Sequence, residues 1–317
     1  MSARPDKTPY DGERFLYHIE STARNLGAGF SESVTRQVLR VFDDEWQSRV
    51  IQLKATDVEG SALHYRYYSN GSVAAIQRAW DAGLIVKDRS PTMALAEEAD
   101  ATFNHAGCDF NAKTGLTKTW AFTGDRVPTE RILQMKAMPQ SARTHAGFFE
   151  RHGLSSVFFV ASDFDKRSMN IYFGWKPRNR TPNWIREFAR DVDGASPTDD
   201  VIRDVLASLA VTAVVATTFS WDRPDLSRWS LYSLGVPYGG QNPGQRRLPP
   251  LPPRIARVHF EAPSLNFEPH INIAWSYGKA GRYMKIEKSY ARDEAHFEAT
   301  EWGGNFSASG THGAQDI

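Results

Sequence analysis

Cysteine and long apolar runs are nearly absent from this sequence. Cys108 is the only cysteine among 317 residues, which excludes an internal disulfide and a zinc site built from thiolates. The longest apolar run, Leu209–Ala216, is interrupted by Thr212 and is far shorter than a membrane-spanning helix. The first thirty residues also lack the apolar stretch of a secretory signal. We therefore expect a cytoplasmic protein that has no membrane partner.

The sequence also lacks a large excess of charge of either sign. The 38 Lys and Arg residues nearly balance the 37 Asp and Glu residues, which gives a net charge of +1. We therefore expect no nucleic-acid partner. Neither a Walker A sequence nor a G-x-G-x-x-G run occurs, so a nucleotide-binding loop is not expected. Aromatic side chains, by contrast, make up 12% of the residues.

One order of elements repeats five times along the chain. Apolar periodicity predicts two helices before each pair of alternating strands, except in the fifth repeat, which has one helix. Capping residues mark four of the helix starts, namely Ser31, Ser90, Thr181 and Ser196, the last three followed by proline. The predicted helices include 12–27, 72–81, 91–102, 129–136, 140–152, 182–192, 197–208 and 253–262. The predicted strand pairs are 50–56 with 62–69, 104–111 with 116–123, 155–164 with 168–175, 211–221 with 226–236, and 269–278 with 282–290.

These elements predict an α+β fold. Helices that interrupt successive hairpins can cover only one face of a sheet, and ten antiparallel strands covered on one face close most easily into a barrel without edges. We therefore predict a ten-stranded antiparallel β-barrel built from five ααββ repeats, with the helices outside. The barrel would be a single domain over residues 11–291. An N-terminal tail at 1–10 and a partly disordered C-terminal segment at 292–317 would lie outside it, and an irregular loop at 237–253 would lie within it.

Alternation along the strands separates the side chains that face the helices from those that face the lumen. The lumenal set is rich in basic and aromatic side chains and contains a single carboxylate, Glu287. Like charges inside a closed barrel are unfavourable unless a polyanion joins them, so a diphosphate is the expected guest. The basic members are Lys54, Arg66, Lys118, Lys166, Arg228 and Lys285, and the aromatic members are Tyr68, Trp120, Tyr172, Tyr232 and Tyr283.

Short segments between about Tyr10 and Tyr290 carry a resemblance to a known family. They include His64-Tyr-Arg-Tyr-Tyr-Ser69, Lys118-Thr-Trp120, Asn170-Ile-Tyr-Phe173 and the stretch from Lys285 to Tyr290. In this order, across five ααββ units, the sequence resembles the soluble aromatic prenyltransferases of the ABBA, or prenyltransferase-barrel, fold. It is most similar to their clorobiocin and novobiocin dimethylallyltransferase branch.

The resemblance implies an enzyme of secondary metabolism that moves a dimethylallyl group from dimethylallyl diphosphate to an aromatic acceptor. The matching positions that would hold the diphosphate are Lys54, Arg66, Lys118, Arg228 and Lys285, and Lys166 matches a donor-site lysine of naphthalene-type relatives. Asn170, Tyr172 and Tyr232 match further donor-side positions. Trp120, Tyr172 and Tyr232 would shield the allyl cation. Glu287 matches a lumenal glutamate near the acceptor and is the candidate base.

Two departures from the family pattern affect the cofactor and the acceptor. Magnesium-dependent relatives carry an aspartate on the second strand, where this sequence has Arg66, so we expect no Mg²⁺ and no other cofactor. Phe158 stands where the 4-hydroxyphenylpyruvate enzymes use arginine, and Ala216 stands where naphthalene-type relatives place tyrosine. Alternation puts Phe158 in the lumen with Val160 and Ser162. We therefore expect a neutral, bulky aromatic acceptor next to Phe158 and Ala216.

Two other functions remain open from the residues alone. A non-catalytic barrel that binds an anionic aromatic ligand would need the same lumen. A phosphohydrolase would need a metal or a nucleophile near the phosphate, and the lumenal set offers neither. Each of these interpretations involves small-molecule partners only, and we expect a monomer.

Overall fold

The computed structural model describes residues 9–69, 74–86, 88–192, 194, 196–210, 212–236, 248–266 and 269–292. Most of the predicted N-terminal tail, most of the irregular loop and nearly all of the C-terminal segment fall outside these residues. Among the described residues, no helix combines the length and the apolar character needed to cross a bilayer.

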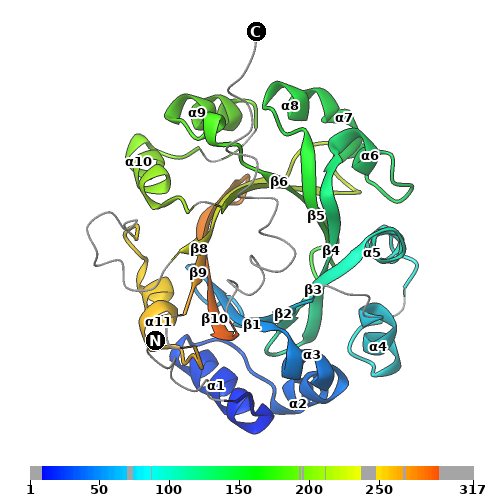
Figure 1. The fold of residues 1–317 in the computed structure, drawn as a ribbon, viewed down its shortest axis with the longest axis vertical. Helices are drawn as coiled ribbons and strands as arrows, with labels where there is room; N and C mark the ends of the chain where they lie inside the picture. Colours follow the sequence, from blue (N-terminus) through cyan, green and yellow to red (C-terminus); the bar gives the residue numbers. More distant parts are fainter. Residues whose placement is uncertain are drawn as a thin grey trace, which may run out of the picture.

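The ten predicted strands form a closed antiparallel barrel, which confirms the expected fold. Each strand pairs with its sequence neighbours, and β1 closes the ring against β10. Figure 1 looks into this ring and shows the helices outside it. The strands are β1 (Val50–Thr56), β2 (His64–Tyr68), β3 (Asn104–Asn111), β4 (Gly115–Pro128), β5 (Ser156–Asp163), β6 (Ser168–Gly174), β7 (Thr212–Ser220), β8 (Arg228–Val236), β9 (Ile271–Gly278) and β10 (Gly281–Ala291).

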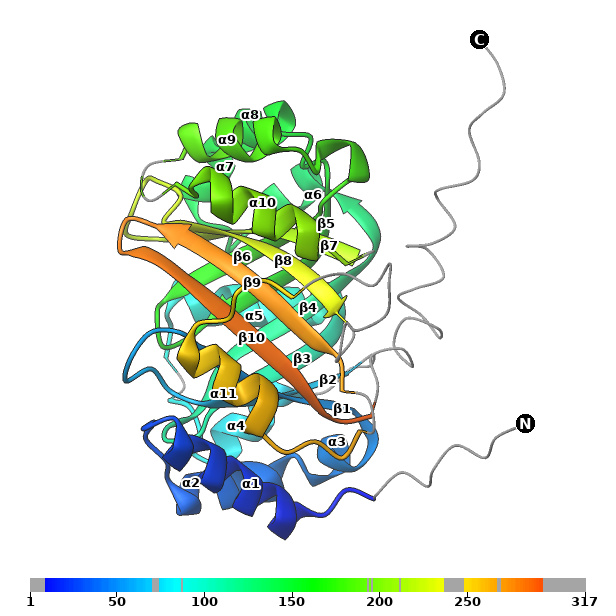
Figure 2. The same ribbon diagram turned by 90° about the vertical axis from the view of Figure 1, so that its left-hand side faces the viewer.

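The helices precede the hairpins in the predicted order. The fifth unit has one helix, α11, which lies along the outer face of β10 (Figure 2). The helix predicted at 140–152 is divided at His145 into α7 and α8. The helices are α1 (Gly12–Asn25), α2 (Glu32–Val41), α3 (Asp43–Ser48), α4 (Ala75–Asp81), α5 (Pro91–Thr102), α6 (Thr129–Leu133), α7 (Gln140–Thr144), α8 (Ala146–Arg151), α9 (Pro182–Arg190), α10 (Asp199–Ser208) and α11 (Pro253–Glu261), with a short 3-10 turn at Pro177–Asn179.

Three of the predicted capping residues start helices as expected. The side chains of Ser31, Ser90 and Thr181 each accept a hydrogen bond from the backbone N–H three residues later, which satisfies one of the free donors of a helix start. The fourth helix begins later than predicted, because α10 starts at Asp199 with Thr198 as its N-cap residue.

The two largest apolar clusters of the described residues lie on opposite faces of the sheet. The larger one, an outer layer, lies between the helices and the outer face of the sheet. There the Phe188 ring packs 4.9 Å from the Trp184 ring and 5.0 Å from the Trp229 ring, measured between centroids. The smaller cluster, around Trp120, Tyr172 and Tyr232, belongs to the lumen. The sheet therefore turns an apolar face to the helices and a mixed polar and aromatic face inward.

The predicted phase of β5 is wrong beyond a bulge. The pairing with β6 shifts between Val157 and Phe159, and a bulge of this kind moves all later side chains to the opposite face. Phe159 and Ala161 therefore face the lumen, whereas Val160 packs in the outer layer and Ser162, in the same phase, does not face the lumen.

Phe158 keeps its place on the inner face of the sheet. Gly174 is in phase with the lumenal Tyr172, so a Cβ added to it would point inward. That Cβ would collide with the ring of Phe158. The missing side chain of Gly174 thus provides the space in which the Phe158 ring lies.

Arg254 joins α11 to the rest of the barrel. Its guanidinium is buried and donates to the carbonyl oxygens of Leu26, Thr56 and Ser61. We predict that Arg254→Met lowers the free energy of unfolding by at least about 2 kcal/mol, because three buried or partly buried carbonyl acceptors lose their donor. The neighbouring Arg257→Met is the control, since Arg257 is exposed and its hydrogen bond within the described part of the chain goes to the Asn25 carbonyl. Urea unfolding of both variants measures the difference, and equal losses would contradict this role.

Candidate active site

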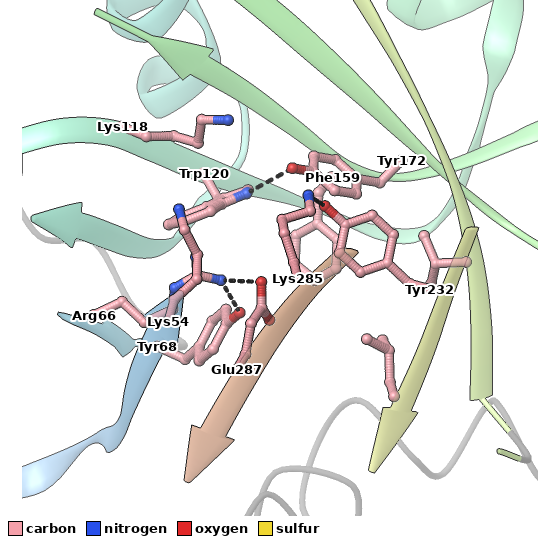
Figure 3. A pocket seen from close by; sticks show the side chains of 12 residues that line it. Lys54, Arg66, Tyr68, Lys118, Trp120, Phe159, Tyr172, Tyr232, Lys285 and Glu287 are labelled. Carbon is pink, nitrogen blue, oxygen red and sulfur yellow. Dashed lines mark hydrogen bonds and ion pairs between the residues drawn. The ribbon is translucent and has the colours of Figure 1, made fainter. Parts of the chain in front are cut away.

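A cavity inside the barrel collects most of the lumenal residues predicted from the sequence. It encloses about 540 Å³ of space free of protein atoms, part of it open to solvent. Figure 3 shows the side chains that line it. They are Lys54, Arg66, Tyr68, Lys118, Trp120, Phe159, Tyr172, Val214, Tyr232, Leu234, Lys285 and Glu287.

Arg66 is the centre of the ionic contacts in this cavity. Its Nη1 lies 2.7 Å from Glu287 Oε1 and donates to the Tyr68 hydroxyl at 3.1 Å (Figure 3). Its Nε and Nη2 each lie 3.3 Å from an oxygen of Asp109. Burial alone would lower the pKa of this guanidinium. The negative charges of Asp109 and Glu287 outweigh that effect and raise the pKa well above its usual value. Arg66 therefore stays charged inside the barrel.

The sequence did not lead us to predict two of the lumenal carboxylates. Asp109 on β3 also contacts the Lys54 ammonium, and Asp163 on β5 lies 3.2 Å from Lys118 Nζ. The expectation that Glu287 is the single carboxylate in the lumen is therefore wrong. One signal was available, because a hairpin of 104–111 with 116–123 pairs Asp109 with Lys118 and so puts both on one face. Asp163 was missed because the bulge in β5 shifts its phase.

These charges alternate around the inner wall. Arg66, Asp109, Lys118 and Asp163 are successive cross-strand neighbours on β2, β3, β4 and β5. Directly opposite charges on one face of a sheet attract, and such pairing is what allows buried cations to stay charged. Burial alone would raise the pKa of Asp109, but Arg66 and Lys54 hold it well below its usual range.

The two lysines on β1 and β10 are the most weakly charged cations of the lumen. Burial lowers the pKa of Lys54 to about 8, although Asp109 opposes this effect. Burial, reinforced by Arg228, lowers the pKa of Lys285 well below its usual value. Lys285 Nζ donates to the Tyr232 hydroxyl and lies 4.5 Å from the ring centroid. A bound anion would raise both pKa values and return positive charge to the site.

Aromatic rings form the wall next to the cations. The Tyr172 ring lies 5.9 Å from the Tyr232 ring and 6.1 Å from the Phe159 ring, between centroids. The guanidinium carbon of Arg66 lies 4.8 Å from the Trp120 ring. Trp120 Nε1 and the Asn170 side-chain amide both donate to the Tyr172 hydroxyl. Hydrogen bonds thus hold Tyr172 in place between its neighbours, and a wall of this composition suits a cation or an aromatic guest.

The remaining part of the wall is small and apolar. Val214 and Leu234 line the cavity there with Phe159, and Ala216 belongs to the same inner cluster, paired with Tyr172 across β6 and β7. This wall has no group that can pair an anion.

Over residues 10–300 the sequence matches the family described as "Aromatic prenyltransferase Orf2". The chain belongs to this family of aromatic prenyltransferases. A 4-hydroxyphenylpyruvate 3-dimethylallyltransferase from Streptomyces niveus is 33% identical over 296 residues, which cover 92% of this chain and 88% of the relative.

Two further relatives that are named as prenyltransferases match over most of this chain at lower identity. A 5,10-dihydrophenazine-1-carboxylate 9-dimethylallyltransferase from Streptomyces anulatus is 27% identical over 282 residues, covering 86% of this chain and 91% of the relative. An aromatic prenyltransferase from Sclerotinia sclerotiorum is 29% identical over 300 residues, covering 92% of this chain and 93% of the relative. This prenyltransferase thus resembles bacterial and fungal members over most of its length.

Two of the predicted diphosphate-binding residues of this prenyltransferase do not line the cavity. Lys166 is exposed in the turn between β5 and β6, so its predicted lumenal position is wrong. Strand alternation does not extend into a turn. Arg228, at the start of β8, lies 5.7 Å from the Tyr283 ring and donates to Thr218 Oγ1, and its charge acts on Lys118 and Lys285.

The surroundings of Asp109 in this prenyltransferase do not fit a magnesium ion. Mg²⁺ needs oxygen ligands in near-octahedral geometry, and Asp109 is the carboxylate that contacts both Lys54 and Arg66. Its two oxygens already contact both cations, and His64 Nδ1 lies 3.4 Å away. A divalent cation at Asp109 would therefore stand beside two other positive groups. Within the described part of the chain, no group of three His, Cys, Asp or Glu side chains is placed to hold a metal ion.

Proposed function

We propose that this enzyme transfers a dimethylallyl group from dimethylallyl diphosphate to a carbon of an electron-rich aromatic acceptor. The observation that carries this proposal is the meeting of buried cations and aromatic ring faces in one cavity. The cations suit the diphosphate, and the rings suit the allyl group and the acceptor. The names of the Streptomyces niveus and Streptomyces anulatus relatives support dimethylallyl as the transferred group.

The reaction would begin with cleavage of the bond between the allyl carbon and the diphosphate oxygen. The electron pair of this bond leaves with the diphosphate, so negative charge grows there. Lys54, Arg66 and Lys118 line the cavity where that charge would be stabilised, with Arg228 and Lys285 adding to the field. Because these groups are fixed before the reaction, they stabilise the leaving group without reorganisation.

The aromatic wall would protect the allyl cation. Ring faces of Trp120, Tyr172 and Tyr232 attract a cation by roughly 0.5–2 kcal/mol each. They also exclude water, which would otherwise capture the cation and give dimethylallyl alcohol. The nearest nucleophile would then be the π-system of the bound acceptor.

The final steps form a carbon–carbon bond and restore the acceptor ring. A ring carbon of the acceptor attacks the allyl cation, and the proton on that carbon then leaves. Glu287 is the proposed base. Its Oε1 contacts Arg66 and its Oε2 accepts from Asn272 at 3.2 Å, so the carboxylate is held in place while a further lone pair on each oxygen stays available.

Loss of one lumenal cation should impair use of the donor. We predict that Lys118→Ala raises the KM for dimethylallyl diphosphate about tenfold or more, because it removes about 1.5–3 kcal/mol of charged contact. Arg228→Ala should raise it by less, because Arg228 does not line the cavity and acts on the donor through its charge. Lys166→Ala is the matched control and should keep the wild-type KM, since Lys166 is exposed in a turn. Steady-state kinetics with varied donor measure the effect. Unchanged KM in both lumenal variants would refute the assigned donor site.

The role of Glu287 is tested separately from donor binding. We predict that Glu287→Gln lowers kcat by more than tenfold and changes the donor KM by much less, because the amide keeps the shape but cannot accept the proton. Turnover and donor KM are measured with the same acceptor. A fully active variant would remove Glu287 from the mechanism.

Metal independence follows from the charges around Asp109. We predict that the rate in excess EDTA is within about twofold of the rate with Mg²⁺, because Lys54 and Arg66 supply the positive charge that a metal supplies elsewhere. Initial rates of product formation under both conditions give the comparison. A loss of a hundredfold or more on chelation would contradict it.

The acceptor should be a neutral and bulky aromatic compound. Phe159, Val214 and Leu234 cannot pair a carboxylate, and an unpaired buried anion loses several kcal/mol of solvation. We predict a higher kcat/KM for a dihydroxynaphthalene than for 4-hydroxyphenylpyruvate, and a gain on the keto acid in Phe158→Arg. A wild-type preference for the keto acid, or no gain in the variant, would overturn this assignment.

A further inference from the structure

Asp109 is a buried charge that the mechanism above does not use. Its side chain is 1% exposed, and it lies directly opposite Arg66 on β2 and Lys118 on β4. One oxygen contacts the Lys54 ammonium, and both oxygens lie within 3.3 Å of Arg66 nitrogens. A carboxylate in this position would repel the diphosphate of the donor. Its presence beside the donor site therefore needs another explanation.

The cations next to Asp109 provide that explanation. Lys54 and Arg66 come from neighbouring strands, and both point into the same cavity (Figure 3). Before the donor binds, two adjacent buried cations without a counter-charge would repel each other, and the lysine would lose its proton. Asp109 is the acidic side chain that contacts both of them.

We propose that Asp109 is a positioning residue for the donor, which holds the Lys54 ammonium and the Arg66 guanidinium at the diphosphate end of the lumen and sustains their positive charge. The inference rests on the proposed function, because it requires that the lumen binds a diphosphate. It assigns Asp109 no contact with the reacting atoms.

Lys54 is the group through which this role can be measured. Burial lowers its pKa to about 8 even with Asp109 in place, so without Asp109 the pKa would fall further. The ammonium would then be lost as the pH rises through a lower value than in the wild type. The charged and titratable groups that face Lys54 are His64 and Arg66 from β2, Asp109 from β3, Lys118 from β4, Asp165 from the turn after β5, and Lys285 and Glu287 from β10.

The test compares binding of inorganic pyrophosphate to the wild type and to Asp109→Asn by calorimetry at pH 6.5 and pH 8.5. The ratio of the two Kd values cancels the ionisation of pyrophosphate and of Lys285, which both proteins share. At pH 6.5 the ratio should be near one or below it, because Lys54 is largely protonated and a repelling charge is gone. At pH 8.5 the variant should bind at least about tenfold more weakly, since each unit of pKa lost by Lys54 is worth a factor of ten.

Two further variants make the result specific. Asp57→Asn is the matched control, because Asp57 follows β1 at the hairpin, outside the lumen, and accepts from the Met284 N–H; its Kd ratio should be near one at both pH values. Lys54→Arg in the Asp109→Asn background should remove the loss at pH 8.5, since a guanidinium keeps its proton there. If Asp109→Asn does not fold, Lys54→Arg alone still tests Lys54, and it should abolish the weakening of binding near pH 8 that the wild type shows.

The outcomes separate this inference from the proposed function. Tighter binding of pyrophosphate by Asp109→Asn at both pH values would mean that Asp109 only repels the donor, and would overturn the inference while leaving the donor site in place. The same pH dependence in Lys54→Arg as in the wild type would also overturn it. A wild type that does not bind pyrophosphate at either pH would instead contradict the donor site itself.

Discussion

The molecule must keep several cations charged inside a closed barrel. The pairing of cations with carboxylates on the inner face of the sheet meets that requirement. In a buried site of low dielectric, an unpaired lysine gives up its proton, and an unpaired arginine has a large solvation cost. Here Arg66 and Lys118 are paired with carboxylates, because Arg66, Asp109, Lys118 and Asp163 follow one another as cross-strand neighbours on four strands. For Lys54 and Lys285, nearby carboxylates do not offset the effect of burial, so the pKa values of both lysines lie below the usual value. The lumen is therefore poised to gain positive charge when an anion enters.

Barrel closure turns this charge pattern into a fixed site. Every strand has two partners, so the register determines which side chains face one another across the wall. The outer layer of Trp184, Phe188 and Trp229 packs the sheet against its helices and leaves the inner face for function. Fixed dipoles and charges act on a developing leaving group without the energetic cost of reorienting water. The proposed chemistry thus depends on the strand register, which holds these charges in place.

The fold was largely predictable from the sequence, because strand alternation, capping residues and the fivefold repeat are local signals. The same alternation placed Lys54, Arg66, Trp120, Tyr172, Tyr232, Lys285 and Glu287 around one cavity, as the structure does. The bulge in β5 was not predictable, since Phe158 and Phe159 are equally apolar and nothing local shows which strand carries the extra residue. Lys166 was misplaced because the alternation of β6 was carried back beyond the start of that strand. Asp109 required the pairing of β3 with β4, which is a relation between strands and not a property of either one.

The central claim is that this lumen couples departure of a diphosphate to attack by an aromatic carbon. Its most direct test is to measure diphosphate release from dimethylallyl diphosphate, with and without a panel of phenols, naphthols and indoles. The amount of diphosphate released is then compared with the amount of prenylated product, measured by mass spectrometry. The account predicts release only when an acceptor is present, with one prenylated product for each diphosphate. Equal release without an acceptor would show hydrolysis, and binding without release under every condition would show a barrel that holds ligands without turning them over.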